Sequence, residues 1–328
     1  MASASSAAAA AQLAALTSAV KELFATTFIG FTVATTLYGV SILQVYLYFR
    51  RYSQDRWTLK TMVATLWILD TLTTIFVAHS LFVFVFGLLS KKADTNIPWG
   101  FTVEKMLVTI ITFIAQCFYA HTIWKVSKNI LTTVFVSVLA VATFGLGIYT
   151  TVHLFQNPGL NSISSRSFLI VSGLVQGLAA LNDIVITASL SYYLHIKRSG
   201  LPSSEKLIDT LIVYAVSRGV LTAVAQIMFL VLNVAMPHHQ YWLPFHLVVG
   251  KLYINSVLAS LNVRSSLSRT EIMLGPGISA LRNNEQMDER DETVTKPIAF
   301  VPMGVAHPPA SSFGTFSRGS VVSDAERG

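Results

Sequence analysis

Residues Ile130–Phe155 read ILTTVFVSVLAVATFGLGIYTTVHLF and contain no Asp, Glu, Lys or Arg. A helix needs roughly 20 apolar residues to cross about 30 Å of hydrocarbon, so this stretch is long enough to cross a bilayer. Its apolar residues form a continuous run and do not alternate with polar ones. Since only helices and closed barrels satisfy their own backbone in lipid, the continuous run predicts a transmembrane helix.

Six further stretches of the same kind occur along the chain. They are Thr26–Phe49, Thr61–Phe84, Thr102–Trp124, Phe168–Leu194, Leu207–Met236 and Leu243–Asn262. No proline interrupts the middle of any of these stretches, which agrees with the cost of proline inside a helix. We therefore predict an all-α fold, an integral membrane bundle of seven transmembrane helices.

The composition excludes an ordinary soluble domain. Hydrophobic residues make up 53% of the 328 residues and charged residues only 12%, whereas soluble domains carry about 25% charged residues. The net charge of +7 does not indicate nucleic-acid binding, because the positive residues lie at the ends of apolar runs. The single cysteine, Cys117, can form neither an intrachain disulfide nor a metal cluster. The expected partner is the lipid bilayer, and no metal or cofactor is predicted.

Lysine and arginine in the short connections predict the orientation. One side of the membrane carries eleven of them and the other side four, or five if Lys105 is included. The eleven are Arg50, Arg51, Arg56, Lys60, Lys125, Lys128, Lys197, Arg198, Lys206, Arg264 and Arg269. Positive charge is retained in the cytosol, so the N-terminus is expected outside and the C-terminus inside.

The composition also divides the chain into three parts. Residues 1–25 are rich in alanine and serine and predict an extracellular segment with a short surface helix around Gln12–Phe24. Residues 26–269 form the predicted transmembrane domain. Residues 270–328 hold eight of the sixteen acidic residues and half of the prolines, which predicts a disordered cytosolic tail.

Five polar residues inside the predicted spans form the candidate intramembrane site: Asp70, Asp183, Arg218, Lys251 and Asn255. An ionisable group at membrane depth costs at least about 2.5–3.5 kcal/mol and is a functional hypothesis by default. At about 1.5 Å per residue, Asp70, Arg218 and Lys251 approach the same plane, and Asp183 lies nearer the cytosol. Asn255 shares a helix face with Lys251.

Two interpretations of these charges stay open. The buried acids and bases can neutralise one another and fix the helix packing, or they can form a ligand or ion site. A basic residue without a partner would favour an anionic ligand. Glu104 and Lys105, at the outer end of their helix, are expected to reach water and are given no role.

Several known motifs are absent from the sequence. A retinal-binding pump usually has an aspartate four residues before its helix-7 lysine, and here Leu247 stands at that position. The helix-3 and helix-7 motifs of common G-protein-coupled receptors are missing, as are hydrolase, zinc-protease and phosphate-binding motifs. The chain is therefore not expected to be an enzyme.

Four stretches of the chain are distinctive: Tyr46-Leu-Tyr-Phe-Arg-Arg-Tyr, Leu66-Trp-Ile-Leu-Asp-Thr-Leu, Ile123-Trp-Lys-Val-Ser and Gly250-Lys-Leu-Tyr-Ile-Asn-Ser-Val-Leu-Ala-Ser-Leu-Asn-Val-Arg. Through these stretches the sequence resembles a family of uncharacterised seven-helix membrane proteins from mushroom-forming fungi. The most specific stretch is the last, whose polar positions are Lys251, Tyr253, Asn255, Asn262 and Arg264. The resemblance covers roughly Thr26 to Arg269. It implies a domain of unknown function over the last three helices, about residues 168–269, and no activity.

Two functions are compatible with these observations. A single seven-helix bundle with a long cytosolic tail favours a receptor or sensor, with an unknown small ligand or a cytosolic partner of the tail. The charges at mid-depth favour a transporter of a small solute, proton or lipid as the alternative, and an intramembrane enzyme is a distant third. The sequence indicates neither the oligomeric state nor the particular membrane.

Overall fold

The computed structural model describes residues 2–89, 96–163, 165–197, 202–236 and 239–273. Their regular structure is helical, apart from one isolated bridge between Asn96 and Gly159. The helices are α1 (Ala2–Arg51), α2 (Trp57–Leu89), α3 (Trp99–Ser127), α4 (Ile130–Gln156), α5 (Leu160–Ile163), α6 (Arg166–Ile196), α7 (Pro202–Ala235) and α8 (Leu243–Met273). Each predicted span lies within one of the seven long helices, except that the span Leu207–Met236 extends one residue beyond the end of α7.

Local sequence explains where several helices begin. Asn129 caps α4, because its side-chain oxygen accepts hydrogen bonds from the backbone N–H groups of Leu131 and Thr132. Lys128, just before it, adopts the left-handed conformation that ends α3. The Ser165 side chain caps α6 in the same way. These caps let antiparallel helices follow one another after very short connections.

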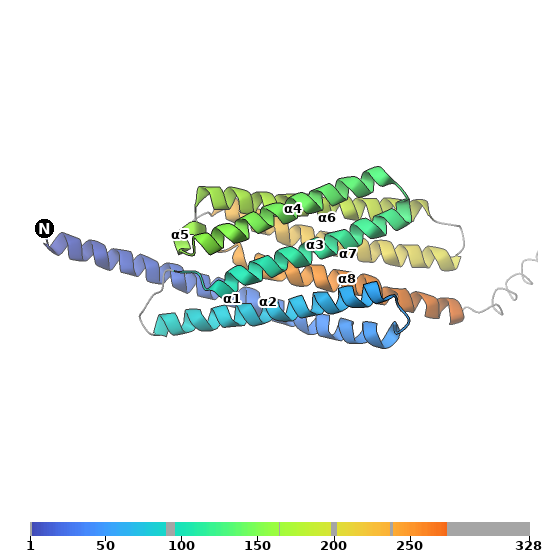
Figure 1. The fold of residues 1–328 in the computed structure, drawn as a ribbon, viewed down its shortest axis with the longest axis horizontal. Coiled ribbons are helices and arrows are strands. Elements are labelled where there is room, and N and C mark those ends of the chain that lie inside the picture. Colours follow the sequence, from blue (N-terminus) through green and yellow to red (C-terminus); the bar gives the residue numbers. More distant parts are fainter. Residues whose placement is uncertain (1, 90–95, 164, 198–201, 237–238, 274–328) are drawn as a thin grey trace, which may run out of the picture. The chain divides into compact units, whose positions relative to one another are not determined.

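The seven long helices lie along one another in a single bundle (Figure 1), and their contacts form a closed ring. Around the ring, α1 lies beside α2, followed by α3, α4, α6, α7 and α8, and α8 returns to α1. The helix α3 also contacts α6 and α8 across the interior. Consecutive helices run in opposite directions, so α1, α3, α6 and α8 all end at one end of the bundle. We call this the basic end, because Arg51, Lys125 and Arg264 lie there.

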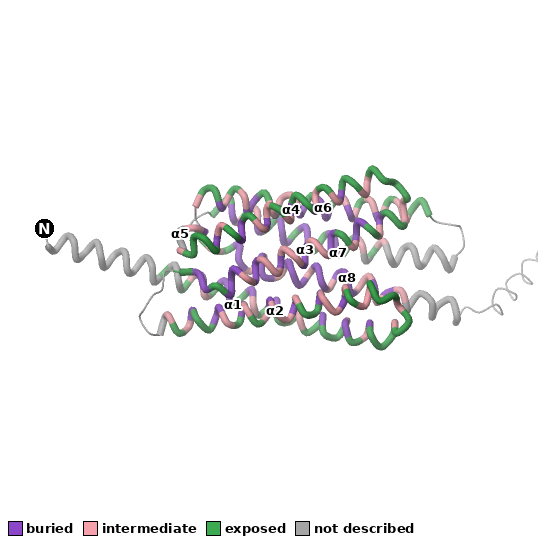
Figure 2. The backbone as a smooth tube through the Cα atoms, viewed as in Figure 1, coloured by how far each residue is buried: buried purple, intermediate pink, exposed green. Residues whose placement is uncertain are grey.

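The outer surface of the bundle suits lipid. Large apolar side chains are exposed along it, including Leu131, Val138 and Val141 on α4. Figure 2 shows the buried residues on the faces that the helices turn toward one another. Among the described residues, six helical segments are long and apolar enough to cross a membrane: Lys21–Arg51, Trp57–Gly87, Trp99–Ser127, Ile130–Gln156, Arg166–Ile196 and Ala215–Ala235. The chain is therefore a multi-pass helical membrane protein.

The last helix, α8, is not among those six segments. Its polar residues His246, Lys251 and Asn255 lower its hydropathy. However, no residue from Trp242 to Arg264 is exposed, so neighbouring helices cover most of the surface of this part of α8. A helix that other helices surround does not need an apolar surface of its own. The seventh span, Leu243–Asn262, therefore remains a prediction. The burial of α8 explains why its hydropathy can be low.

The N-terminal part of the chain differs from the expected organisation. The short surface helix predicted around Gln12–Phe24 is not separate, because α1 runs without a break from Ala2 to Arg51. No glycine or proline occurs before Gly30, and alanine, the best helix former, dominates the first turns. The helical segment Lys21–Arg51, which is long and apolar enough to cross a membrane, contains the predicted span Thr26–Phe49. The predicted tail, apart from its first residues to Met273, lies outside the described residues.

Candidate functional site

The Lys251 ammonium on α8 contacts the first buried carboxylate, that of Asp70 on α2. Lys251 Nζ lies 2.5 Å from Asp70 Oδ1, and both side chains are almost fully buried. The same ammonium also donates to the Asp70 carbonyl at 2.9 Å, to Thr73 Oγ1 at 2.9 Å and to Thr74 Oγ1 at 2.7 Å. Four oxygens from one turn of α2 therefore lie within hydrogen-bond distance of the ammonium group. The group has three hydrogens, so all of them can be donated to α2.

Asn255 extends this first cluster to α1. Its side-chain nitrogen lies 3.1 Å from the Leu37 carbonyl, 3.0 Å from Ser41 Oγ and 2.9 Å from the Lys251 carbonyl. Tyr38 of α1 also faces the cluster, since Lys251 Nζ lies 5.1 Å from the centre of its ring. The first cluster thus joins α1, α2 and α8, and Thr73, Thr74 and Lys251 border a cavity of only about 10 Å³.

The second cluster contains the other two predicted charges. Arg218 of α7 donates through Nη2 to Asp183 Oδ1 of α6 at 3.1 Å, and both side chains are buried. The second carboxylate oxygen accepts from Tyr253 OH of α8 at 2.7 Å. Gln226 Nε2 in turn donates to that phenol oxygen at 2.6 Å. The four predicted charges therefore form two acid–base pairs, and neither pair has an unmatched charge.

The aromatic ring of Tyr119 on α3 completes the second cluster. The central carbon of the Arg218 guanidinium lies 3.5 Å from the centre of this ring, which is a cation–π arrangement. The Tyr119 hydroxyl lies 3.1 Å from Ser260 Oγ and 3.3 Å from Ser256 Oγ on α8. Tyr119 and Gln226 could not be singled out from the sequence, because a single tyrosine or glutamine in an apolar helix is common in a bundle core.

The helices α6 and α7 approach very closely next to the second cluster, at Gly219. A methyl group built at Gly219 would lie 1.8 Å from Thr187 Oγ1. We expect Gly219→Ala to lower the free energy of unfolding by about 1–3 kcal/mol, the usual cost of overpacking a core. Denaturation in mixed micelles, followed by circular dichroism, measures this effect.

A matched control is available on α4. A methyl group at Gly145 would meet nothing within 4 Å, so Gly145→Ala should leave stability equal or slightly higher, because alanine favours helix. Equal stability of the Gly219 and Gly145 variants would contradict the close contact.

A third polar group lies toward the opposite end of the bundle. Glu104 Oε2 of α3 is 3.3 Å from His246 Nε2 of α8, and both side chains are buried. Lys105 is also buried, and its ammonium lies 5.9 Å from the centre of the Phe168 ring. The expectation that Glu104 and Lys105 reach water is therefore wrong. The reason is the position of α3, which contacts α8 and α6 across the interior of the ring.

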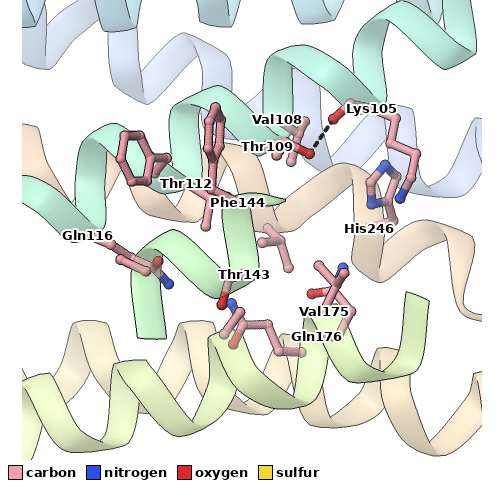
Figure 3. A pocket seen from close by; sticks show the side chains of 15 residues that line it. Lys105, Val108, Thr109, Thr112, Gln116, Thr143, Phe144, Val175, Gln176 and His246 are labelled. Atoms are coloured by element: carbon pink, nitrogen blue, oxygen red, sulfur yellow. Dashed lines mark hydrogen bonds between the residues drawn. The ribbon is translucent and has the colours of Figure 1, made fainter. Parts of the chain in front are cut away.

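Lys105 and His246 line a small internal cavity between α3, α4, α6 and α8 (Figure 3). Gln116, Gln176 and Gln226 contribute further polar side chains to its wall. The volume open to the centres of water molecules is about 30 Å³, which is enough for about two waters. Both amide atoms of Gln116 and the Nδ1 atom of His246 lack a hydrogen-bond partner among the described residues. Such buried polar groups are suited to binding a polar molecule.

The residues of the helix-7 motif do not form one site. Lys251 and Asn255 belong to the first cluster, and Tyr253 belongs to the second. Asn262 Nδ2 donates to the Gln44 carbonyl of α1 at 2.9 Å, and Arg264 Nη2 lies 2.6 Å from Asp55 Oδ2 at the basic end. The motif residues therefore form hydrogen bonds and ion pairs from α8 to different neighbouring segments along the length of the helix.

A larger cavity opens at the basic end, where α2, α3, α6, α7 and α8 meet. Its volume open to the centres of water molecules is about 380 Å³, within the usual range of about 300–1,000 Å³ for ligand pockets. Tyr119 and Ser260 line it, together with the basic residues Arg56, His121 and Lys125. The second cluster thus borders this cavity through the ring of Tyr119.

Comparison with protein families gives one match, over the last three long helices. Residues 179–266 match a family of unknown function, DUF6534. The DUF6534 region contains Asp183, Arg218, Tyr253 and Lys251, and it agrees with the domain of unknown function predicted over about residues 168–269. No curated protein and no solved structure matches the chain.

Proposed function

We propose that this chain is a receptor- or sensor-like membrane protein, without enzymatic activity, in which the small internal cavity, which has room for about two waters, is coupled to the cavity at the basic end. We also propose the full topology of seven membrane spans, with the N-terminus outside and the C-terminus in the cytosol. The resemblance to the seven-helix fungal family over Thr26–Arg269 supports this topology.

The observation that carries the proposal is a continuous series of contacts between the two cavities. Gln226 lines the internal cavity and donates to Tyr253, which donates to Asp183. Asp183 accepts from Arg218, whose guanidinium lies on the ring of Tyr119. Tyr119 lines the cavity at the basic end. A change at one cavity therefore has a direct physical path to the other.

The ion pairs also support a receptor more than a transporter. The acid and the base of each pair are in direct contact, and none of the four charges lines either of these two cavities. The space beside Lys251 measures only about 10 Å³. A transporter that used these charges for transport would have to open them to a substrate. In a receptor, by contrast, closed pairs hold the helices in one of two arrangements, and a ligand shifts the balance between them.

A label at the basic end tests the proposed coupling without a known ligand. A fluorophore is attached to Lys125→Cys in a Cys117→Ser background, and the purified full chain is studied in nanodiscs. We expect Gln226→Leu, which removes the donor to Tyr253, to change the emission or mobility of the label. Gln44→Leu makes the same chemical change away from the internal cavity and should not. An unchanged label in both variants would reject the coupling.

The transporter alternative is tested separately. Liposomes that contain the full chain are loaded with a panel of amino acids, organic acids and sugars, and exchange against labelled compound is measured. Exchange that disappears in the double variant Asp70→Asn and Lys251→Met would favour a transporter and would contradict the receptor proposal. The proposal expects no exchange above that of empty liposomes.

The proposed orientation gives a further prediction. An epitope tag before Met1 should be reached by antibody on intact cells, and a tag after Gly328 should be reached only after the cells are made permeable. The reason is the excess of lysine and arginine at the basic end, which is retained in the cytosol. The reverse pattern of staining would show that the basic end faces outward.

A further inference from the structure

We propose that the cavity at the basic end binds the head group of an anionic phospholipid from the adjacent membrane leaflet. This inference goes beyond the receptor proposal and does not depend on it.

The cavity combines an apolar wall with a basic rim. Leu59, Phe118, Leu190 and Leu261 are buried or half-buried residues that line it. Arg56, His121 and Lys125 also line it, and all three are exposed. This arrangement matches a molecule with one apolar part and one negatively charged part.

The basic side chains at the rim are available to bind an anion. The ion pairs of the described residues do not include Arg56, His121 or Lys125. Arg264, which also lines the cavity, is already held by Asp55 and forms part of the wall. An arginine and a lysine are the usual partners of a phosphate oxygen, and the arginine can bind it through two hydrogen bonds.

The size and position of the cavity favour a lipid over a free anion. A volume of about 380 Å³ is much larger than an inorganic phosphate needs, and the apolar wall would gain nothing from one. Trp57, next to Arg56, is exposed, and Trp124, next to Lys125, is also exposed. Tryptophan is enriched at the membrane–water interface, where lipid head groups lie. Anionic lipids are concentrated in the cytosolic leaflet, which the proposed orientation places at this end.

The test uses the purified full chain in a neutral detergent, so it depends neither on the orientation nor on the receptor proposal. Short-chain phosphatidic acid, short-chain phosphatidylcholine and inorganic phosphate are titrated, and binding is measured by thermal shift and microscale thermophoresis. We expect saturable binding of phosphatidic acid, at least tenfold weaker binding of phosphatidylcholine, and no competition by millimolar phosphate. Equal binding of the two lipids, or full competition by phosphate, would overturn the proposal.

Variants separate a specific site from general attraction to a basic surface. The double variant Arg56→Gln and Lys125→Gln should weaken phosphatidic acid binding at least tenfold. The control Arg50→Gln and Arg51→Gln removes the same charge from exposed residues of the basic end that do not line the cavity. Equal weakening in both double variants would show non-specific attraction and reject the site.

A steric variant tests the cavity without a change of charge. Ala215 lines the cavity from α7 and is half-buried. Ala215→Phe should fill part of the space and weaken phosphatidic acid binding, while the melting temperature of the lipid-free protein shows whether the variant still folds. Unchanged affinity in a folded Ala215→Phe variant would place the lipid outside the cavity.

Discussion

Replacing Lys251 by methionine is expected to lower the free energy of unfolding by about 3–5 kcal/mol. The change removes the cation that holds Asp70 and leaves a carboxylate that is 0% exposed without its partner. It also removes the donor to Thr73 and Thr74. Denaturation of the purified protein in mixed micelles, followed by circular dichroism, measures the loss.

The double variant Asp70→Leu and Lys251→Met is the control for this first pair. A buried ion pair can often be replaced by apolar residues of similar volume at little cost. We therefore expect the double variant to regain most of the stability that the single variant loses. A single variant as stable as the wild type would show that the pair contributes nothing to folding.

Replacing Asp183 by asparagine is expected to destabilise the protein by a similar amount, about 3–5 kcal/mol, and more than replacing Arg218 by methionine does. The two changes differ because arginine keeps its charge at any accessible pH, whereas a carboxyl group can take up a proton and become neutral. Asp183→Asn therefore leaves a permanent buried charge. Arg218→Met leaves a carboxyl group that still accepts from Tyr253.

The same unfolding measurement compares the two variants of the second pair. Lys125→Met serves as a reference, because Lys125 is exposed and surface changes usually alter stability by less than about 0.5 kcal/mol. If Arg218→Met proved the more damaging change, the cation–π contact with Tyr119 would outweigh the buried charge, and this explanation of the second cluster would be wrong.

The helices themselves could be predicted from the sequence because each apolar run is long and uninterrupted. The weak point was α8, whose Lys251 and His246 lower its hydropathy. Hydropathy describes how well the residues of a helix suit contact with lipid. A helix that is mostly covered by other helices can therefore cross the membrane with a lower hydropathy. The continuous α1 was also missed, because a helix that extends beyond the membrane leaves no hydropathy signal in residues 2–20.

The charges of the candidate site could be foreseen better than their partners. Asp70, Arg218 and Lys251 were placed at similar depths, so a buried acid–base pair could be anticipated, but the choice of Lys251 or Arg218 as the partner of Asp70 was left open. The partner of Arg218 stayed open, because helix ends predicted to within about 2–4 residues leave several ångströms of uncertainty in depth. Glu104 and Lys105 were misplaced because no feature of α3 alone shows that it contacts both α6 and α8. Tyr119 and Gln226 became visible only in the structure.

Because α8 is mostly covered by its neighbouring helices, its place in the bundle affects how the protein is assembled in the membrane. On the proposed seven-span topology, α8 is the last of the seven spans to leave the ribosome, and Lys251 makes its insertion as a single helix less favourable by about 2.5–3.5 kcal/mol. The earlier helices carry the acceptors for that lysine, on α2, and for Asn255, on α1. Completion of the ring is therefore expected to wait until these helices have assembled, and a chain released before α8 would present an open, polar slot to lipid and to the quality-control machinery of the cell.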